Sequence, residues 1–327
     1  MSLLKSIKTG ATPTALRLLV YGTPGIGKTT WAAQIPGALF LTCEDGGGDM
    51  DYARIEVGSW RVLMETLTEI DREGVPEGYR VLVLDTINGF SERCIEFVCE
   101  RMRVDSIEEP GFGKGYTALQ EEQCRARDTL DRIRVKHGIH IVLIGHAHVK
   151  TFNDPTGPAY DRYMLRMHEK VSAVWVAWAD VVAFATMDVT VKGGKRGKEI
   201  EDPMAKGKAT GGERTMFLSS APAYEAKNRF NLPDELPLSW PAFAKAIGWQ
   251  ERESAVAPKP VAVADVAAAI LPRLATETCT EAESASIAAK LITACGGDTR
   301  KAAAFAGTIA TDRLVKNLID LRGGGAK

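Results

Sequence analysis

Short, continuously apolar runs alternate with amphipathic stretches from Leu16 to about Gly145. Strands that are buried on both faces have this apolar character, because neither face meets water. Alternation of such strands with helices is typical of α/β proteins with a mostly parallel sheet covered by crossover helices. The pattern predicts four strands, at Leu16–Tyr21, Ala38–Thr42, Arg80–Leu84 and Ile139–Ile144.

Further elements follow this region. A helix is predicted from Tyr116 to His137, because apolar side chains recur on one face and oppositely charged side chains stand four residues apart on the other. A second helix contains Trp175 and Trp178, which we interpret as core packing rather than a ligand box. Later strands, partly paired as hairpins, are predicted at Val181–Thr186, Asp188–Lys192 and Arg214–Leu218.

Composition changes twice along the chain. Residues 192–208 are rich in Gly and Lys, which favours a mobile hairpin tip. The segment ERESAVAPKPVAVAD resembles a semi-rigid linker, and an Ala-rich stretch with helical spacing follows it. We therefore predict a core domain over residues 1–249, a linker over 250–264 and a small helical C-terminal domain over 265–327.

Charge and cysteine content limit the partners. The 327 residues include 41 Lys and Arg and 42 Asp and Glu, so the net charge of −1 gives no general attraction to polyanions. A nucleic-acid partner must therefore be met by a local patch. The six cysteines show no C-x-x-C spacing, which favours free thiols in a reducing compartment. Without a signal peptide or a long apolar run, we expect a cytoplasmic protein with no membrane partner.

The segment GTPGIGKT, residues 22–29, matches the P-loop pattern G-x-x-x-x-G-K-[ST] between a strand and a helix. Its glycines let successive N–H groups point at phosphates, Lys28 reaches the β/γ oxygens and Thr29 offers a hydroxyl to Mg²⁺. The sequence thus predicts ATP and Mg²⁺ as ligands. The predicted nucleotide contacts are Gly22, Thr23, Pro24, Gly25, Ile26, Gly27, Lys28, Thr29 and Thr30.

A carboxylate at the end of a neighbouring strand should hold the magnesium, and Asp85 in VLVLDT supplies it. In many AAA+ proteins a glutamate follows this aspartate and activates the attacking water, but here Thr86 follows. Glu44, after the strand Ala38–Thr42, is our candidate general base, because a carboxylate there can reach that water. Asp45 is a close competitor, and a helix cap or loop acid is the alternative role for Glu44.

His146 follows the strand Ile139–Ile144 in IVLIGHAHVK and is predicted to sense the γ-phosphate from the tip of that strand. A structural histidine is the main alternative. A metal site formed with His148 is a weaker one, because no further Cys/His cluster accompanies the pair.

The order of these motifs resembles the RecA-like core, and more narrowly the phage-type RecA-like ATPases that accompany single-strand annealing and recombination. The resemblance covers about residues 14–235 and rests on GTPGIGKTT, FLTCED, VLVLDT, IVLIGHAHVK and EAKNRF. It implies a RecA-like P-loop NTPase core that hydrolyses ATP. Tyr52 approximately matches the adenine-stacking tyrosine of that family.

RecA-like assemblies use a K-x-[KR] pair that reaches a neighbour's γ-phosphate, and Lys227 and Arg229 match it. Positive charge there would stabilise the transition state. The resemblance thus implies a homo-oligomer, a filament or a ring, with an active site shared between subunits. Two solvated cations on a loop are the alternative.

Two loops grip single-stranded DNA in RecA-like proteins. The matching stretches here are Asp105–Tyr116 and Val149–Arg166, in which cations stand near aromatic rings that could neutralise phosphates and stack bases. Active-site lids have a similar composition. The predicted DNA contacts are Phe112, Lys114, Lys150, Phe152 and Arg162.

The sequence therefore predicts a DNA-dependent ATPase that oligomerises on single-stranded DNA and promotes annealing or recombination. The resemblance implies a phage-encoded protein with a single-strand DNA-binding protein as a further partner. A helicase or helicase loader is one alternative. Another is an ATP-switched regulatory protein that does not bind DNA.

Overall fold

The chain divides into two compact units, Met1–Ala257 and Pro258–Lys327. The computed structural model describes residues 14–43, 50–155, 157–192, 208–250, 267 and 280–294. Residues 251–264 of the predicted linker lie outside this set. In the second unit the described helix is α9 (Glu281–Ala294), in which Ile287 and Leu291 are buried.

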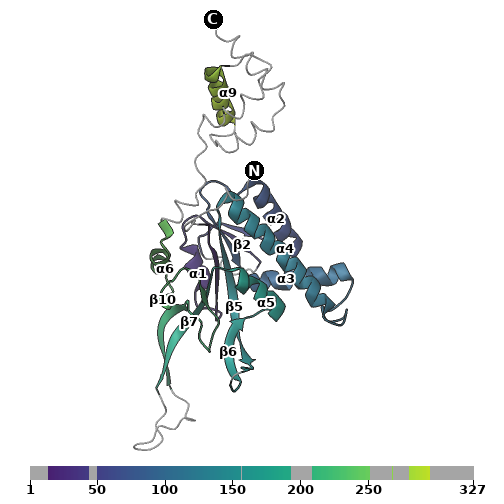
Figure 1. The fold of residues 1–327 in the computed structure, drawn as a ribbon, viewed down its shortest axis with the longest axis vertical. Coiled ribbons are helices and arrows are strands. Elements are labelled where there is room, and N and C mark those ends of the chain that lie inside the picture. The colour runs from purple at the N-terminus through teal and green to yellow at the C-terminus, as the bar shows by residue number, and fades with distance from the viewer. Residues whose placement is uncertain are drawn as a thin grey trace, which may run out of the picture. The chain divides into compact units, whose positions relative to one another are not determined.

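The first unit is built on one sheet with the strand order β10-β8-β7-β1-β5-β4-β2-β3 (Figure 1). All neighbours from β3 to β7 pair in parallel, while β8 and β10 add antiparallel pairs at the other edge. The predicted α/β class with a mostly parallel sheet is thus confirmed. The strands in this order are β10 (Glu235–Pro237), β8 (Lys208–Phe217), β7 (Val181–Lys192), β1 (Arg17–Gly22), β5 (His140–Phe152), β4 (Val81–Asp85), β2 (Ala38–Thr42) and β3 (Arg54–Glu56).

Helices cover both faces of the sheet (Figure 1). One face carries α2 (Trp60–Glu73), α3 (Ile87–Met102), α4 (Lys114–His137) and α5 (Glu169–Trp178). The opposite face carries α1 (Lys28–Ala33) and α6 (Trp240–Ile247). Burial of apolar side chains in these two layers is the main stabilising contribution.

Tryptophans belong to both layers. Trp31 of α1 meets Trp240 and Phe243 of α6 at ring-centroid distances of 5.6 Å each. Trp175 is fully buried and donates its indole N–H to Gln123 Oε1 at 3.0 Å. The interpretation of Trp175 as core packing is thus confirmed.

The structure corrects two sequence-based boundaries. The predicted loop Val149–Arg166 is largely a hairpin, because β5 continues to Phe152 and pairs antiparallel with β6 (Tyr160–Leu165). The two predicted strands near residue 188 form the single strand β7, with an irregular register between Met187 and Val189. The predicted hairpin tip lies outside the described residues from 193 to 207, although Lys192 and Lys208 flank it as a strand pair.

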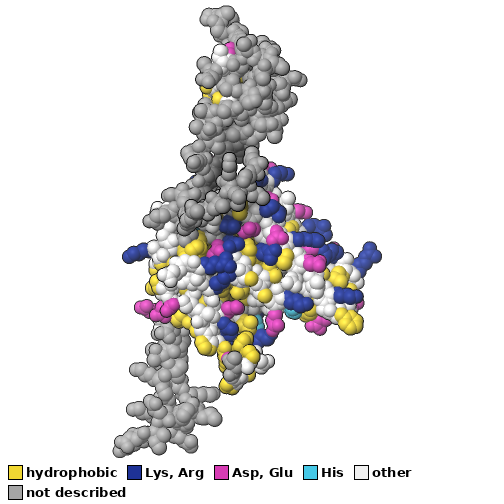
Figure 2. Space-filling view, in the orientation of Figure 1, with side chains coloured by type: hydrophobic (Ala, Val, Ile, Leu, Met, Phe, Trp, Pro, Cys, Tyr) yellow, Lys and Arg dark blue, Asp and Glu magenta, His cyan; other side chains and the backbone are white. Residues whose placement is uncertain are grey.

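The surface seen in Figure 2 carries basic and acidic side chains interspersed, in keeping with the near-zero net charge. Free thiols among the described residues are Cys43, Cys94, Cys99 and Cys124. Within the described ranges, the structure contains no helix with the length and apolar character needed to cross a membrane.

Candidate nucleotide-binding site

The P-loop connects the carboxyl end of β1 to the start of α1, as the sequence predicts. Gly25 and Gly27 have φ values of 76° and 102°, a left-handed range in which side chains are strained. Gly22 is required for another reason, since a Cβ built there would lie 2.0 Å from the Ala185 carbonyl oxygen on β7. The glycines therefore allow both the curl of the loop and its close approach to the sheet.

Lys28 is buried, with 5% of its surface exposed. Its Nζ donates hydrogen bonds to the carbonyl oxygens of Gly22 and Thr23 at 3.1 and 3.0 Å. It also lies 3.5 Å from His146 Nδ1. The loop thus folds around its own lysine and holds the ammonium group in the site.

Thr29 and Asp85 are brought together across two elements. The Thr29 hydroxyl donates to Asp85 Oδ2 at 2.7 Å. A hydroxyl and a carboxylate are hard oxygen donors that suit Mg²⁺, so this pair fits the ion that the motifs imply. Bound there, Mg²⁺ would neutralise charge on the β- and γ-phosphate oxygens.

Thr86 occupies the position where a catalytic glutamate is common. Its Oγ1 accepts a hydrogen bond from the Gly89 N–H at 3.2 Å and so caps α3. The Asp85–Thr86 peptide bond is cis. This position supplies a helix cap, so the carboxylate that activates water must come from another segment.

Glu44 and Asp45 lie outside the described residues. The chain that leads to them runs beside Asp85, because Thr42 pairs with Asp85 in the parallel ladder. Cys43 also donates its N–H to the Asp85 carbonyl oxygen at 3.3 Å. The role of Glu44 as general base stays a prediction.

His146 lies beside the P-loop, opposite Gly22 in the β1–β5 ladder. Its N–H donates to Asn88 Oδ1 at 2.6 Å, and Asn88 Nδ2 donates to the Arg166 carbonyl oxygen at 2.6 Å. Asn88 is buried and was missed from the sequence, where its only signal is a polar residue in the first turn after Asp85. It fixes the backbone of His146.

A cavity of about 240 Å³ unites these groups. Its lining residues are Gly25, Gly27, Lys28, Thr29, Thr30, Asp85, Thr86, Ile144 and His146. Among the described residues, no group of three or more His, Cys, Asp or Glu side chains could hold a metal ion, and His148 Nδ1 is buried without a hydrogen-bond partner. The P-loop, the Thr29–Asp85 pair and His146 therefore face one cavity.

Tyr52 packs on Phe40 of β2, with ring centroids 4.4 Å apart. Burial, followed by the negative charge of Asp85, raises the pKa of its phenol. The predicted contact with adenine stays a prediction.

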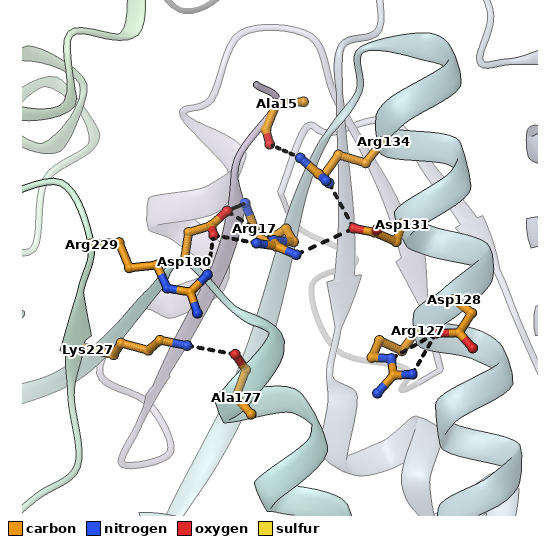
Figure 3. A network of polar contacts seen from close by, with 10 residues as sticks. All are labelled: Ala15, Arg17, Arg127, Asp128, Asp131, Arg134, Ala177, Asp180, Lys227 and Arg229. Carbon is orange, nitrogen blue, oxygen red and sulfur yellow. Dashed lines mark hydrogen bonds and ion pairs between the residues drawn. The ribbon is translucent and has the colours of Figure 1, made fainter. Parts of the chain in front are cut away.

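Lys227 and Arg229 have partners within the chain (Figure 3). Lys227 Nζ donates to the carbonyl oxygens of Val176 and Ala177 at 3.1 and 2.7 Å, at the end of α5. Arg229 Nη1 donates to Asp180 Oδ1 at 3.2 Å. Strand β9 (Lys227–Asn228) pairs with the first residues of β7, which places both cations at the amino edge of the sheet, away from the P-loop of the same chain.

The hairpin brings three of the predicted DNA contacts together. Lys150 stands opposite Arg162 in the β5–β6 register. The Arg162 guanidinium lies 5.5 Å from the centroid of the Phe152 ring and also donates to the Tyr224 carbonyl oxygen at 3.2 Å. Lys150 forms an ion pair with Glu169 at the start of α5.

The other two predicted DNA contacts stand at the start of α4. Phe112 is fully exposed in a left-handed conformation with φ 49°, and Lys114 is the first residue of the helix. Tyr116 stacks on His168 at 3.9 Å, directly before α5. The start of α5 thus contacts both predicted DNA-binding segments.

Comparison with known proteins places these observations in a family. The SPbeta prophage-derived uncharacterized protein YorG of Bacillus subtilis (strain 168) is 21% identical over 133 residues, which are 40% of this chain and 40% of YorG. A crystal structure of the RadB recombinase aligns with a TM-score of 0.35 and 14% identity, covering 64% of this chain and 82% of RadB. A family model described as AAA domain matches residues 14–230. Because that match spans more than half of the chain and contains the whole site described above, the protein belongs to the AAA domain family of nucleotide-binding P-loop ATPases.

Proposed function

We propose that this ATPase responds to single-stranded DNA, oligomerises on it and promotes annealing or recombination. One observation carries the proposal. Strand β5 holds His146 beside the P-loop lysine and continues, four residues later, into the hairpin that displays Lys150 and Phe152. A single strand therefore joins the phosphate site to the candidate DNA contacts.

The hairpin has the chemistry that unspecific single-strand binding requires. Cations on a groove neutralise phosphates, and aromatic rings stack on bases of any sequence. Lys150, Arg162 and Phe152 supply both kinds of group within one strand pair. Phe112, fully exposed before α4, offers a second ring.

Coupling of DNA binding to hydrolysis follows from the contacts of His146. Its position depends on the β1 ladder and on Asn88, which in turn binds the Arg166 carbonyl oxygen just after β6. DNA that shifts the hairpin would therefore shift His146 relative to Lys28. We expect DNA to stimulate hydrolysis through this contact.

Steady-state ATP hydrolysis with and without a single-stranded oligonucleotide tests the proposal. We expect stimulation in the parent and its loss in His146→Ala, while DNA binding of that variant persists. Equal rates with and without DNA would favour the ATP-switched regulatory protein, and unwinding of a forked duplex would favour the helicase.

The ion pair of Lys150 gives a sharper test of the DNA path. Lys150→Ala should flatten the slope of log affinity against log salt by roughly 0.7, the value for one lost phosphate contact to a single strand. Lys150→Ala should also weaken DNA binding, whereas Glu169→Gln should strengthen it, because the substitution releases Lys150 from its acidic partner. Phe152→Ala should cost about 1–3 kcal/mol of binding with little change in slope.

Lys245→Ala, an exposed lysine on α6, is the matched control and should bind DNA like the parent. If the Lys150 and Phe152 variants also bind like the parent while neutralising Lys195, Arg196 and Lys198 abolishes binding, the DNA path lies at the predicted hairpin tip instead.

A shared active site is the part of the proposal that concerns Lys227 and Arg229. To act in trans, both side chains must leave Ala177 and Asp180, their partners within the chain. Mixing Lys227→Ala with Lys28→Ala protein should then restore activity, because an intact P-loop on one subunit can face an intact cation on its neighbour. Mixed oligomers without any rescue would show that these cations serve their own chain.

A further inference from the structure

Arg214 lies on β8, outside the sequence motifs, and its backbone is fixed on both sides. It stands opposite Met187 of β7 in the antiparallel ladder. Its carbonyl oxygen accepts a hydrogen bond from the Leu238 N–H at 2.8 Å, next to β10. The strand therefore holds the Cα of Arg214 in a defined place.

The side chain of Arg214 faces the P-loop. Side chains two residues apart on a strand share a face, and Met216 is buried in the same core layer as Ile26 of the P-loop. A Cβ built on Gly27 would lie 2.9 Å from Arg214 Nη1. The guanidinium group of Arg214 thus reaches Gly27, the glycine that precedes the P-loop lysine, from strand β8.

The charge of Arg214 has no acidic partner in the part of the chain that the structure describes, and its side chain is exposed. Two arginines elsewhere in the core unit differ in this respect, because Arg17 and Arg229 both pair with Asp180. Arg214 is therefore placed to meet an anion at Gly27.

We propose that Arg214 binds the phosphate chain of the nucleotide in cis, together with Lys28; this inference rests on the ATP site proposed above. Backbone N–H groups of a P-loop cradle the α- and β-phosphates, while its lysine reaches the β- and γ-phosphates. A guanidinium at Gly27 is therefore assigned to the α/β end of the chain. Its planar fork can donate two parallel hydrogen bonds to phosphate oxygens.

This position makes Arg214 a binding residue for ATP and ADP alike. An interaction with the α/β end is present before and after the γ-phosphate is lost, so it stabilises ground state and transition state equally. Loss of such uniform binding raises KM and leaves kcat unchanged. The role differs from that predicted for Lys227 and Arg229, which concerns the γ-phosphate of a neighbouring subunit.

Calorimetric titration of the full-length protein with ADP and with a non-hydrolysable ATP analogue, both with Mg²⁺, tests the assignment. For Arg214→Ala we expect both Kd values to rise about 10- to 100-fold, the range for loss of a charge-assisted hydrogen bond. The Kd values of Arg214→Lys should lie between those of Arg214→Ala and the parent. For both variants, kcat at saturating ATP should stay within about twofold of the parent value.

Glu213→Gln is the matched control, since Glu213 is the preceding residue of β8, is exposed like Arg214 and has no place among the residues that line the nucleotide cavity. Its Kd values should equal those of the parent. Unchanged Kd values in Arg214→Ala would overturn the inference, and so would weaker binding of the ATP analogue with unchanged ADP binding, which marks a γ-phosphate contact. A parent protein that binds neither nucleotide would instead overturn the ATP site itself.

Discussion

Asp180 connects three segments at the amino edge of the sheet, and Asp180→Ala is expected to destabilise the core unit. Its carboxylate accepts hydrogen bonds from Arg17 Nε at 3.0 Å, from Arg17 Nη2 at 2.6 Å and from the Arg17 N–H at 3.2 Å. Arg229 adds a fourth at 3.2 Å (Figure 3). The hydrogen bonds that Arg17 donates to Asp180 raise the pKa of Arg17, so the guanidinium stays charged.

The expected loss of unfolding free energy follows from the charge of Arg17, which Asp180→Ala leaves without its main partner. Removing one partner of a buried ion pair costs about 3–5 kcal/mol, because the other charge remains desolvated. The Arg17 side chain is 19% exposed and keeps Asp131 at 3.5 Å, which moves the expectation to the lower end, about 3 kcal/mol. For a unit of this size such a loss lowers Tm by roughly 6–12 °C.

Urea denaturation and thermal melting, followed by circular dichroism, measure this loss. Two partners of the network are the controls. Asp131→Ala and Arg229→Ala should each cost about 1 kcal/mol or less, because their side chains are 39% and 50% exposed. An Asp180→Ala protein within about 1 kcal/mol of the parent would refute the reasoning, since it would mean that Arg17 needs no buried counter-charge.

Three further outcomes are expected. Lys28→Ala should abolish nucleotide binding in a calorimetric titration, because it removes the buried ammonium group of the P-loop; undiminished affinity would contradict the site assignment. Glu44→Gln should bind ATP but lose hydrolysis, whereas normal turnover would transfer the role of base to Asp45 or another group. Burial lowers the pKa of His168, so the unfolded chain binds its proton more readily and stability should rise as pH increases from that lowered value to about 6.5. In His168→Asn, which keeps a cap for α5, the rise of Tm with pH should be smaller; an unchanged rise would assign it to other groups.

The sequence predicted the strands that carry the phosphate site because their environment is uniform. Strands β2 and β4 are buried on both faces, so they appear as short apolar runs whose ends are easy to find. The P-loop and Asp85 follow from local spacing, and the structure brings Thr29 and Asp85 together as expected.

The missed features depend on contacts between distant residues. Strand β5 is buried only as far as Gly145, and its outer half pairs with a single partner, so its apolar run ends before the strand does. Strand β3 is three exposed residues and gives no apolar signal. Asn88 lies 58 residues from His146, and no motif records the approach of Arg214 to Gly27.

The β5–β6 hairpin has a mechanical consequence. Up to Ile144, β5 is paired with β1 on one side and β4 on the other, and His146 still pairs with Gly22 of β1, whereas beyond His146 the strand is paired with β6 alone. The six residues from 147 to 152 form a cantilever arm of roughly 20 Å. A Cβ on Gly145 would lie 2.4 Å from Leu165 Cδ1 and 3.3 Å from Tyr21 Cβ, so β5 is tightly packed there. A load at the tip of this arm produces its largest bending moment at the base of the arm. His146, which lies beside the P-loop, is the residue at that base.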